Sequence, residues 1–144
     1  MEATTVLNTG SQLNTNYDSS VVLLGKNTFE NEQYTNGTGI TVTLTAGTVM
    51  GRIAATGKLL PVVIAAVDGS QFPVGILAST VTVLNAATAD VSLCVTGEVA
   101  SEKLIFNAAE TLSSIVSTRQ LRDYLAAAGI KVLVSDKLSG YDNQ

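Results

Sequence analysis

The middle of the chain alternates short apolar and polar runs with glycine-containing turns, a pattern typical of consecutive β-strands. Residues 40–45 are the clearest run, because their isoleucine, valine and leucine would share one strand face while threonines take the other. Asn36-Gly37 separates this run from residues 28–35. The arrangement predicts a β-hairpin whose turn is the Asn-Gly dipeptide.

Two further turns are expected at glycines. The apolar run of residues 21–24 ends at Gly25, which predicts a first strand followed by a turn. Asp68-Gly69 likewise separates residues 60–67 from residues 72–77, so we expect a second pair of strands joined there.

Residues 91–95 alternate again, with valines and a leucine on one face and polar residues between them. Cys94 is therefore expected to face away from the apolar side of this strand. Gly97 is expected to turn the chain at its end.

One helix is predicted near the C-terminus. Ser117 and Gln120 have the spacing of a capping box, in which each side chain would bond a free amide of the first turn. Gly129 is placed to end the helix in the left-handed conformation, before a last strand over residues 130–134. The apolar residues at helical spacing are Leu121, Tyr124, Leu125 and Ala128.

Residues 1–20 are mostly Asn, Thr and Ser, and cannot form a core alone. Their larger apolar side chains are irregularly spaced. We expect a flexible N-terminal arm, residues 1–20, ahead of a single β-rich domain, residues 21–144. The arm's β-favouring residues could pair with another chain's strand edge, and a frayed terminus without a role is the alternative. The sizeable apolar residues of the arm are Val6, Leu7, Leu13 and Tyr17.

Composition narrows the functional classes. The 144 residues suffice for one domain with a core, Cys94 has no partner for a disulfide, and the lack of histidine excludes a histidine-based zinc or acid–base site. A net charge of −4 without a basic cluster argues against nucleic-acid binding. Apolar runs too short for a membrane span, and an N-terminus unlike a signal peptide, predict a soluble protein made inside the cell. Only 14% of the residues are charged, which is low for a surface fully exposed to water. This composition is more easily explained if a partner covers part of the surface.

Candidate chemistry is weak throughout. Residues 51–58 resemble a phosphate-binding loop, but five residues instead of four separate the glycines and no Ser or Thr follows Lys58. Glu98 and Glu102 are interpreted as solvated acids, and Cys94 has no base to activate it. The sequon that begins at Asn36 is interpreted as a turn. We therefore predict no catalytic residues, no metal site and no cofactor.

Several motifs, taken in order, resemble the head decoration proteins of lambda-like tailed bacteriophages. The first are Ala46-Gly-Thr-Val-Met-Gly-Arg-Ile53 and Ala55-Thr-Gly-Lys-Leu-Leu-Pro61, followed by Asp68-Gly-Ser70 and Val74-Gly-Ile-Leu-Ala78. Residues 91–104 are similar to the next strand, glycine turn and outgoing strand of the family. Residues 121–134 are similar to its helix, glycine and final strand.

The resemblance implies a compact, mainly β domain, β-clip-like or small and barrel-like, with one C-terminal helix and a flexible N-terminal arm. It implies a homotrimer on the outer surface of the virion at three-fold positions, bound to the major capsid protein and resisting the pressure of packaged DNA without catalysis. The family's arm adds a strand to neighbouring capsid subunits. Apolar anchors must then contribute to arm binding, and Val6, Leu7, Leu13 and Tyr17 are the candidates.

Two alternatives belong to other classes. A trimeric receptor- or glycan-binding module of a phage tail or fibre would need exposed aromatic rings, and the chain has no Trp and only seven Phe and Tyr residues. An enzyme on a related β fold would need a charged cluster or a histidine, which the sequence lacks.

Overall fold

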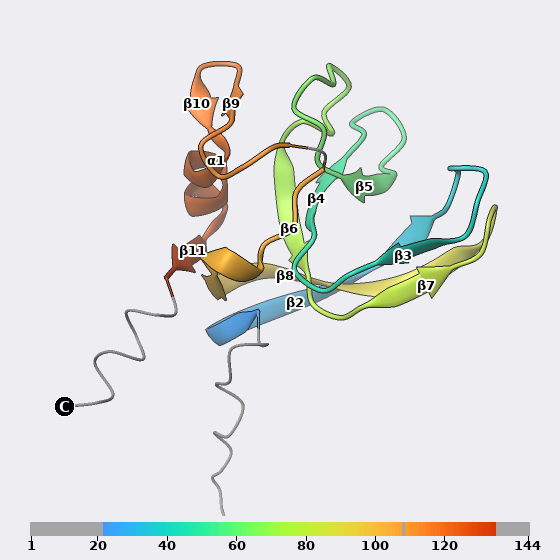
Figure 1. Ribbon diagram of the computed structural model, residues 1–144, viewed down its shortest axis with the longest axis horizontal. Coiled ribbons are helices and arrows are strands. Elements are labelled where there is room, and N and C mark those ends of the chain that lie inside the picture. The colour runs from blue at the N-terminus through green and yellow to red at the C-terminus, as the bar shows by residue number, and fades with distance from the viewer. Residues whose placement is uncertain (1–21, 108, 135–144) are drawn as a thin grey trace, which may run out of the picture.

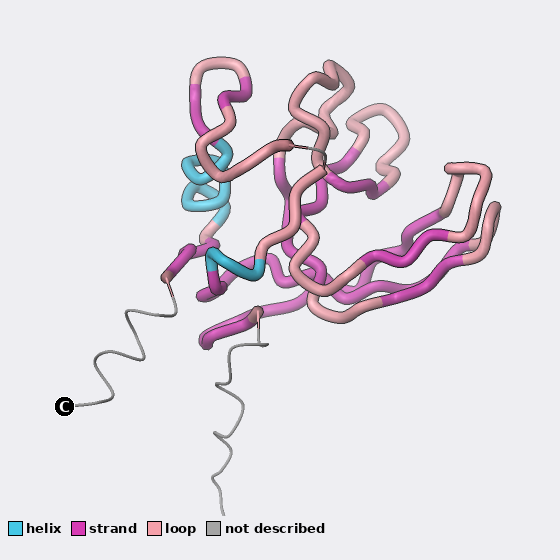
Figure 2. The backbone as a smooth tube through the Cα atoms, in the orientation of Figure 1, coloured by secondary structure: helices cyan, strands magenta, loops and turns pink. Residues whose placement is uncertain are grey.

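The computed structural model describes residues 22–107 and 109–134 of the chain. This part is mainly β, with one helix near its C-terminal end, which confirms the predicted fold class (Figures 1 and 2). The elements are β2 (Leu23–Thr35), β3 (Val42–Leu44), β4 (Val49–Arg52), β5 (Leu59–Pro61), β6 (Pro73–Leu77), β7 (Val81–Val83), β8 (Thr88–Ala100), a 3₁₀ turn (Ser101–Lys103), β9 (Ile115–Val116), β10 (Arg119–Gln120), α1 (Leu121–Ala128) and β11 (Ile130–Leu133).

The long strand β8 organises the main sheet. β2 runs antiparallel along one edge of β8, while β6 and β11 share the other edge, β6 antiparallel and β11 parallel. β4 follows β6, and β5 follows β4. β3 pairs with β7, and β9 pairs with β10, in two small separate sheets. None of the described helices is long and apolar enough to cross a membrane.

Apolar side chains cover both faces of the main sheet. On one face, Leu121 and Leu125 of α1 pack in a core that includes Ile76 and Cys94. On the other face, a second core joins residues of the main sheet, such as Leu93, to the β3–β7 ribbon. The sequence predicted that Cys94 lies opposite to the apolar side of this strand, and it does, but the structure shows that both faces of the strand are apolar. Cys94 does point opposite to Leu93, but α1 covers that side and leaves the thiol fully buried.

The predicted hairpin at Asn36-Gly37 does not form. β2 pairs with β8, and β3 pairs with β7, so the residues between β2 and β3 cross from one sheet to the other. Asn36 is fully buried, and its side-chain amide donates to the carbonyl of Val83, 47 positions along the chain. A long-range partner therefore replaces the local turn. Ile40 lies outside β3 and is 68% exposed, so it does not share the face of Leu44.

Gly25 and Gly97 were expected to turn the chain, and both predictions are wrong. Each glycine lies inside a strand, where β2 is bulged against β8. A side chain at Gly97, whose φ is +122°, would lie 2.6 Å from the Cα atom of Asn27. Gly97 thus permits close contact between the two long strands.

The turn at Asp68-Gly69 is present, held by a hydrogen bond from the Ser70 amide to the Asp68 carboxylate of 3.0 Å. The strands on either side of it, however, do not pair with each other. β5 and β6 instead lie on opposite edges of β4.

The predicted capping box at α1 is wrong, whereas the predicted end of the helix is confirmed. Ser117 lies between β9 and β10 with a φ of +59°, and the helix begins after Gln120 without a side-chain cap. The amide of Leu121 donates instead to the Ser114 carbonyl at 2.9 Å, so the preceding loop satisfies the first turn. Gly129 ends the helix in the left-handed conformation, and β11 follows as expected.

Arg52 and Glu32 connect β4 to β2 on the side of the second core. The guanidinium donates to both carboxylate oxygens at 3.0 Å, and the two side chains are only 33% and 21% exposed. The hydrogen bonds from Arg52 hold the pKa of Glu32 below its ordinary value. The pair therefore stabilises the fold while Glu32 is ionised.

We predict that Glu32→Gln lowers the free energy of unfolding at pH 7 by about 1 kcal/mol, a value limited by partial exposure. Because the folded-state pKa of Glu32 is lowered, this difference from the wild type should disappear as the pH falls below about 4.5 and through the folded-state pKa. Urea unfolding at several pH values measures it. Glu30→Gln removes a nearby carboxylate that Arg52 does not bond and serves as the control. A difference that persists in acid would contradict the assignment.

Candidate functional site

The two ends of the described chain meet at one end of β8. The Val22 carbonyl accepts a hydrogen bond from the Ala100 amide at 2.8 Å, and Leu133 pairs with Ala100 from the opposite edge. Neighbouring strands lie about 4.8 Å apart, so the ends of the described chain are separated by about 10 Å. Figure 1 shows β2 beginning and β11 ending at this place, which we call the terminal end.

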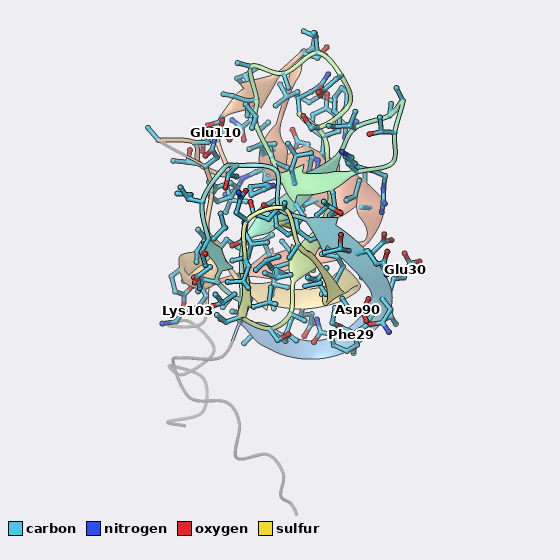
Figure 3. The ribbon with its side chains drawn as sticks, turned by 90° about the vertical axis from the view of Figure 1, so that its right-hand side faces the viewer. Phe29, Glu30, Asp90, Lys103 and Glu110 are labelled. Atoms are coloured by element: carbon cyan, nitrogen blue, oxygen red, sulfur yellow. The ribbon has the colours of Figure 1, made fainter. Side chains whose placement is uncertain are left out.

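The terminal end is firmly packed. Gly47 lies so close to the Lys103 carbonyl that a side chain there would overlap it, and the same Cβ atom would lie 3.4 Å from the Val22 side chain. Val22 is also part of the core beneath α1. Lys103 marks this end in Figure 3. Residues 1–21 therefore join the domain at a rigid platform, although the predicted anchors Val6, Leu7, Leu13 and Tyr17 lie outside the described residues.

The candidate chemical groups form no reactive set. After β4 the chain turns through residues 53–58 directly into β5, so no helix N-terminus follows that could bind a phosphate. Glu98 is half-buried in β8, and Glu102 is exposed in the 3₁₀ turn. Burial raises the pKa of the Cys94 thiol, which donates to the Thr96 carbonyl at 3.1 Å. No group of His, Cys, Asp and Glu residues within residues 22–107 and 109–134 could hold a metal ion.

The sequon at Asn36 is inaccessible in the folded protein. Its amide nitrogen donates to the Ile40 and Val83 carbonyls at 2.7 and 2.9 Å, and its oxygen accepts from the Thr38 amide and hydroxyl at 3.0 and 2.8 Å. A fully buried side chain with all these bonds cannot carry a glycan. It instead fixes the loop between β2 and β3.

An uncharged groove of about 200 Å³ lies between β3 and the segment that follows the 3₁₀ turn. Ile105, 39% exposed, and Leu44 belong to its apolar lining, and the amide of Ile105 bonds the Gly47 carbonyl at 2.9 Å. We call it the Ile105 groove. Its lining includes Leu44, Thr45, Thr48, Pro61, Ile105 and Phe106.

A second uncharged apolar surface lies at the far end of the β3–β7 ribbon. Ile40 and Leu84 are 68% and 66% exposed there, and no residue of 36–41 or 84–87 is charged. We call this surface the ribbon tip. Sequence reasoning missed it because Ile40 was placed in a strand. The signal available was Gly39, directly before Ile40, which takes a φ of +92° and ends the regular pattern.

Residues 12–129 match the sequence model of the family described as bacteriophage lambda head decoration protein D. The chain belongs to this family. A search of curated proteins finds no match. The resemblance inferred from the motifs is thereby confirmed, and the decoration protein is a structural component of the virion, bound on the exterior of the phage capsid.

The match spans most of the described domain of the decoration protein, from before β2 to the end of α1. It also includes Leu13 and Tyr17, two of the four predicted arm anchors, whereas Val6 and Leu7 precede it. β11 follows the matched region.

Proposed function

We propose that this decoration protein binds as a homotrimer to the major capsid protein at the three-fold positions of the phage head, and stabilises the head against the pressure of its DNA. The observation that carries the proposal is the terminal end, where residues 1–21 and 135–144 join the domain side by side. Because the N-terminal and C-terminal segments both attach at this end of the domain, the arm can be directed to the capsid while the rest of the fold points outward.

Arm binding is the proposed source of adhesion. Ordering each arm residue costs about 1–2 kcal/mol of backbone entropy, which backbone hydrogen bonds of about 1 kcal/mol each scarcely offset. Burying an apolar side chain contributes about 1.5–3 kcal/mol, so anchors such as Leu13 and Tyr17 are required. Three arms on one trimer then act together, and multivalency can raise the avidity about 10²–10⁴-fold above the affinity of one arm.

The four proposed anchors are not equivalent. Leu13 and Tyr17 lie within the family match and only nine and five residues before Val22. Val6 and Leu7 lie outside it. We therefore place the main capsid contact at Leu13 and Tyr17.

We predict that deletion of residues 1–20 leaves a folded trimer but abolishes binding to heads. The core of the described domain contains none of the deleted residues, so the thermal unfolding temperature should stay near that of the full chain. Co-sedimentation with purified expanded heads, together with molecular mass in solution, measures both results. Undiminished head occupancy by the truncated protein would overturn the arm mechanism.

A matched pair of variants tests which anchors matter. The double variant Leu13→Ala/Tyr17→Ala should reduce head occupancy at least tenfold at subsaturating protein. Val6→Ala/Leu7→Ala, which removes a similar apolar contribution outside the family match, should have the smaller effect. A larger loss of head occupancy for Val6→Ala/Leu7→Ala than for Leu13→Ala/Tyr17→Ala would indicate that the main capsid contact lies at the start of the arm.

A further inference from the structure

We propose that a polar groove beside β2 binds a neutral carbohydrate. The groove has a volume of about 480 Å³, within the range of about 300–1,000 Å³ that is usual for small-molecule sites. The proposal needs only the position of the decoration protein on the capsid exterior, and neither the trimer nor the arm. The lining residues are Asn31, Glu32, Gln33, Gly57 and Asp90. We call this surface the β2 groove.

One wall of the β2 groove belongs to the solvent-exposed face of β2. The register between β2 and β8 is regular from Phe29 to the end of β2, so alternate residues share a face. Phe29, Asn31 and Gln33 are exposed on this face, whereas Tyr34 is buried in the second core on the other. Asp90 of β8 lies opposite Gln33, and Figure 3 shows it on the same side of the molecule as Phe29. An aromatic ring and a series of hydrogen-bonding side chains therefore lie in one row.

The polar side chains of this row keep free bonding capacity. The Gln33 amide nitrogen donates to one carboxylate oxygen of Asp90 at 3.3 Å, which orients both side chains. The other Asp90 oxygen and the Gln33 amide oxygen bond no described residue, and neither does the Asn31 amide group. Part of the row is thus held in place before a ligand arrives, which lowers the entropy lost on binding.

The charges around the groove nearly balance. Glu32 is paired with Arg52, which also donates to the Gly57 carbonyl at 3.3 Å and so fixes the opposite wall. Asp90 adds a negative charge, and the exposed Lys58 follows Gly57 in the chain. An anionic ligand would meet the Asp90 carboxylate while the guanidinium is already bonded. A polar ligand without net charge fits this groove best.

Sugar hydroxyls match the groups that the groove presents. Each hydroxyl both donates and accepts, as do the amides of Asn31 and Gln33, while the Asp90 carboxylate accepts. Phe29 is 50% exposed and lies about 7 Å from Asn31, the spacing of alternate residues on one strand face. The apolar face of a sugar ring can cover the phenyl ring while its hydroxyls reach the polar row. A protein partner would instead need an apolar centre, which this lining lacks.

The β2 groove also lies where a ligand can reach it on the virion. β2 begins at the terminal end and runs toward the opposite end of the molecule (Figure 1). An arm that binds the capsid therefore leaves the groove open. Water competes for each exposed hydrogen bond, so one site binds weakly, and several copies on one capsid would act together through multivalency.

The first experiment titrates the isotope-labelled full chain with lactose, maltose, cellobiose and N,N′-diacetylchitobiose, each separately, and follows the main-chain amides by NMR. At least one sugar should shift the signals of Asn31, Gln33 and Gly57 at millimolar concentration and leave that of Ile105 unchanged. Glucuronate, which carries a carboxylate, should cause no shift. Absence of a response to all four neutral sugars would overturn the proposal, and so would shifts confined to other residues or tighter binding of glucuronate.

Variants at exposed residues then test the assignment with the sugar that binds. Phe29→Ala and Asp90→Ala should each weaken binding by about fivefold or more, whereas Phe29→Tyr, which keeps the ring, should retain the wild-type affinity. Glu30→Gln, on the opposite face of β2, and Ile115→Ala, at an exposed apolar residue of β9, are the controls and should bind normally. Circular dichroism verifies that each variant is folded. Undiminished binding by folded Phe29→Ala and Asp90→Ala would overturn the site, whereas a wild type that binds sugar but not heads would refute the proposed function alone.

Discussion

Replacing Asn36 by Asp is expected to lower the free energy of unfolding at pH 7 by about 3–5 kcal/mol, since two carbonyls lose their donors and a buried carboxylate faces them instead. The Asn36 side chain is fully buried and donates to the Ile40 and Val83 carbonyls. A loss of this size is a large part of the 5–15 kcal/mol that stabilises a typical domain. Urea unfolding followed by circular dichroism measures it.

The pH dependence of this variant separates charge from lost bonds. The carboxyl at position 36 favours its neutral form in the fold, so the deficit relative to the wild type should shrink as the pH is lowered and the carboxyl becomes protonated. Thr38→Val is the control, because it removes the hydroxyl bonds to the Asn36 oxygen at 2.8 Å and to the exposed Ile40 main chain at 3.1 and 3.4 Å, but leaves the Asn36 amide on both carbonyls, and should cost about 1 kcal/mol. Equal urea midpoints for Asn36→Asp and the wild type would show that this side chain does not hold the tip.

Gly51→Ala is expected to lower the free energy of unfolding by about 2–3 kcal/mol through overpacking. A Cβ atom at Gly51 would overlap the Ser70 carbonyl oxygen and lie 3.1 Å from the Phe72 carbonyl oxygen. These are main-chain atoms, and Ser70 cannot retreat, since it is 1% exposed and its hydroxyl bonds Asp68 at 2.6 Å. Denaturant unfolding measures the loss.

Gly37→Ala is the matched control for that prediction. Nothing lies within 4 Å of the position that a Cβ atom would take at Gly37, so the same substitution should change the stability by less than about 0.5 kcal/mol. If Gly51→Ala were as stable as Gly37→Ala, the turn after Asp68 would have to move easily enough to accommodate a methyl group on β4.

Gly51 also illustrates how the sequence misleads. Next to Arg52 and seven residues before Lys58, it resembles the start of a phosphate loop. In the structure it lies in β4 opposite Pro73, where a register shift brings the chain close to the following turn. The glycine is required by a neighbour that lies some twenty residues further along, which no local motif reveals.

One end of the helix could be predicted from the sequence, and the other could not. Its end was predictable, because a left-handed glycine after the last apolar residue is a local feature of the chain. Its start was not, since the Leu121 and Arg122 amides bond the Ser114 and Leu112 carbonyls rather than a nearby side chain. Capping of this kind depends on how the preceding loop folds.

The amino-acid sequence by itself determined the mainly β class, the position of the helix, and the family through an ordered series of motifs. These features depend on neighbouring residues or on local spacing. Only the tertiary structure decided that Asn36 leads into a crossover rather than a hairpin, that Cys94 is covered by α1, and that both ends of the described chain meet beside Ala100. Each of these depends on partners far apart in the sequence, whose pairing is set by burial on both faces of the sheet and not by local pattern.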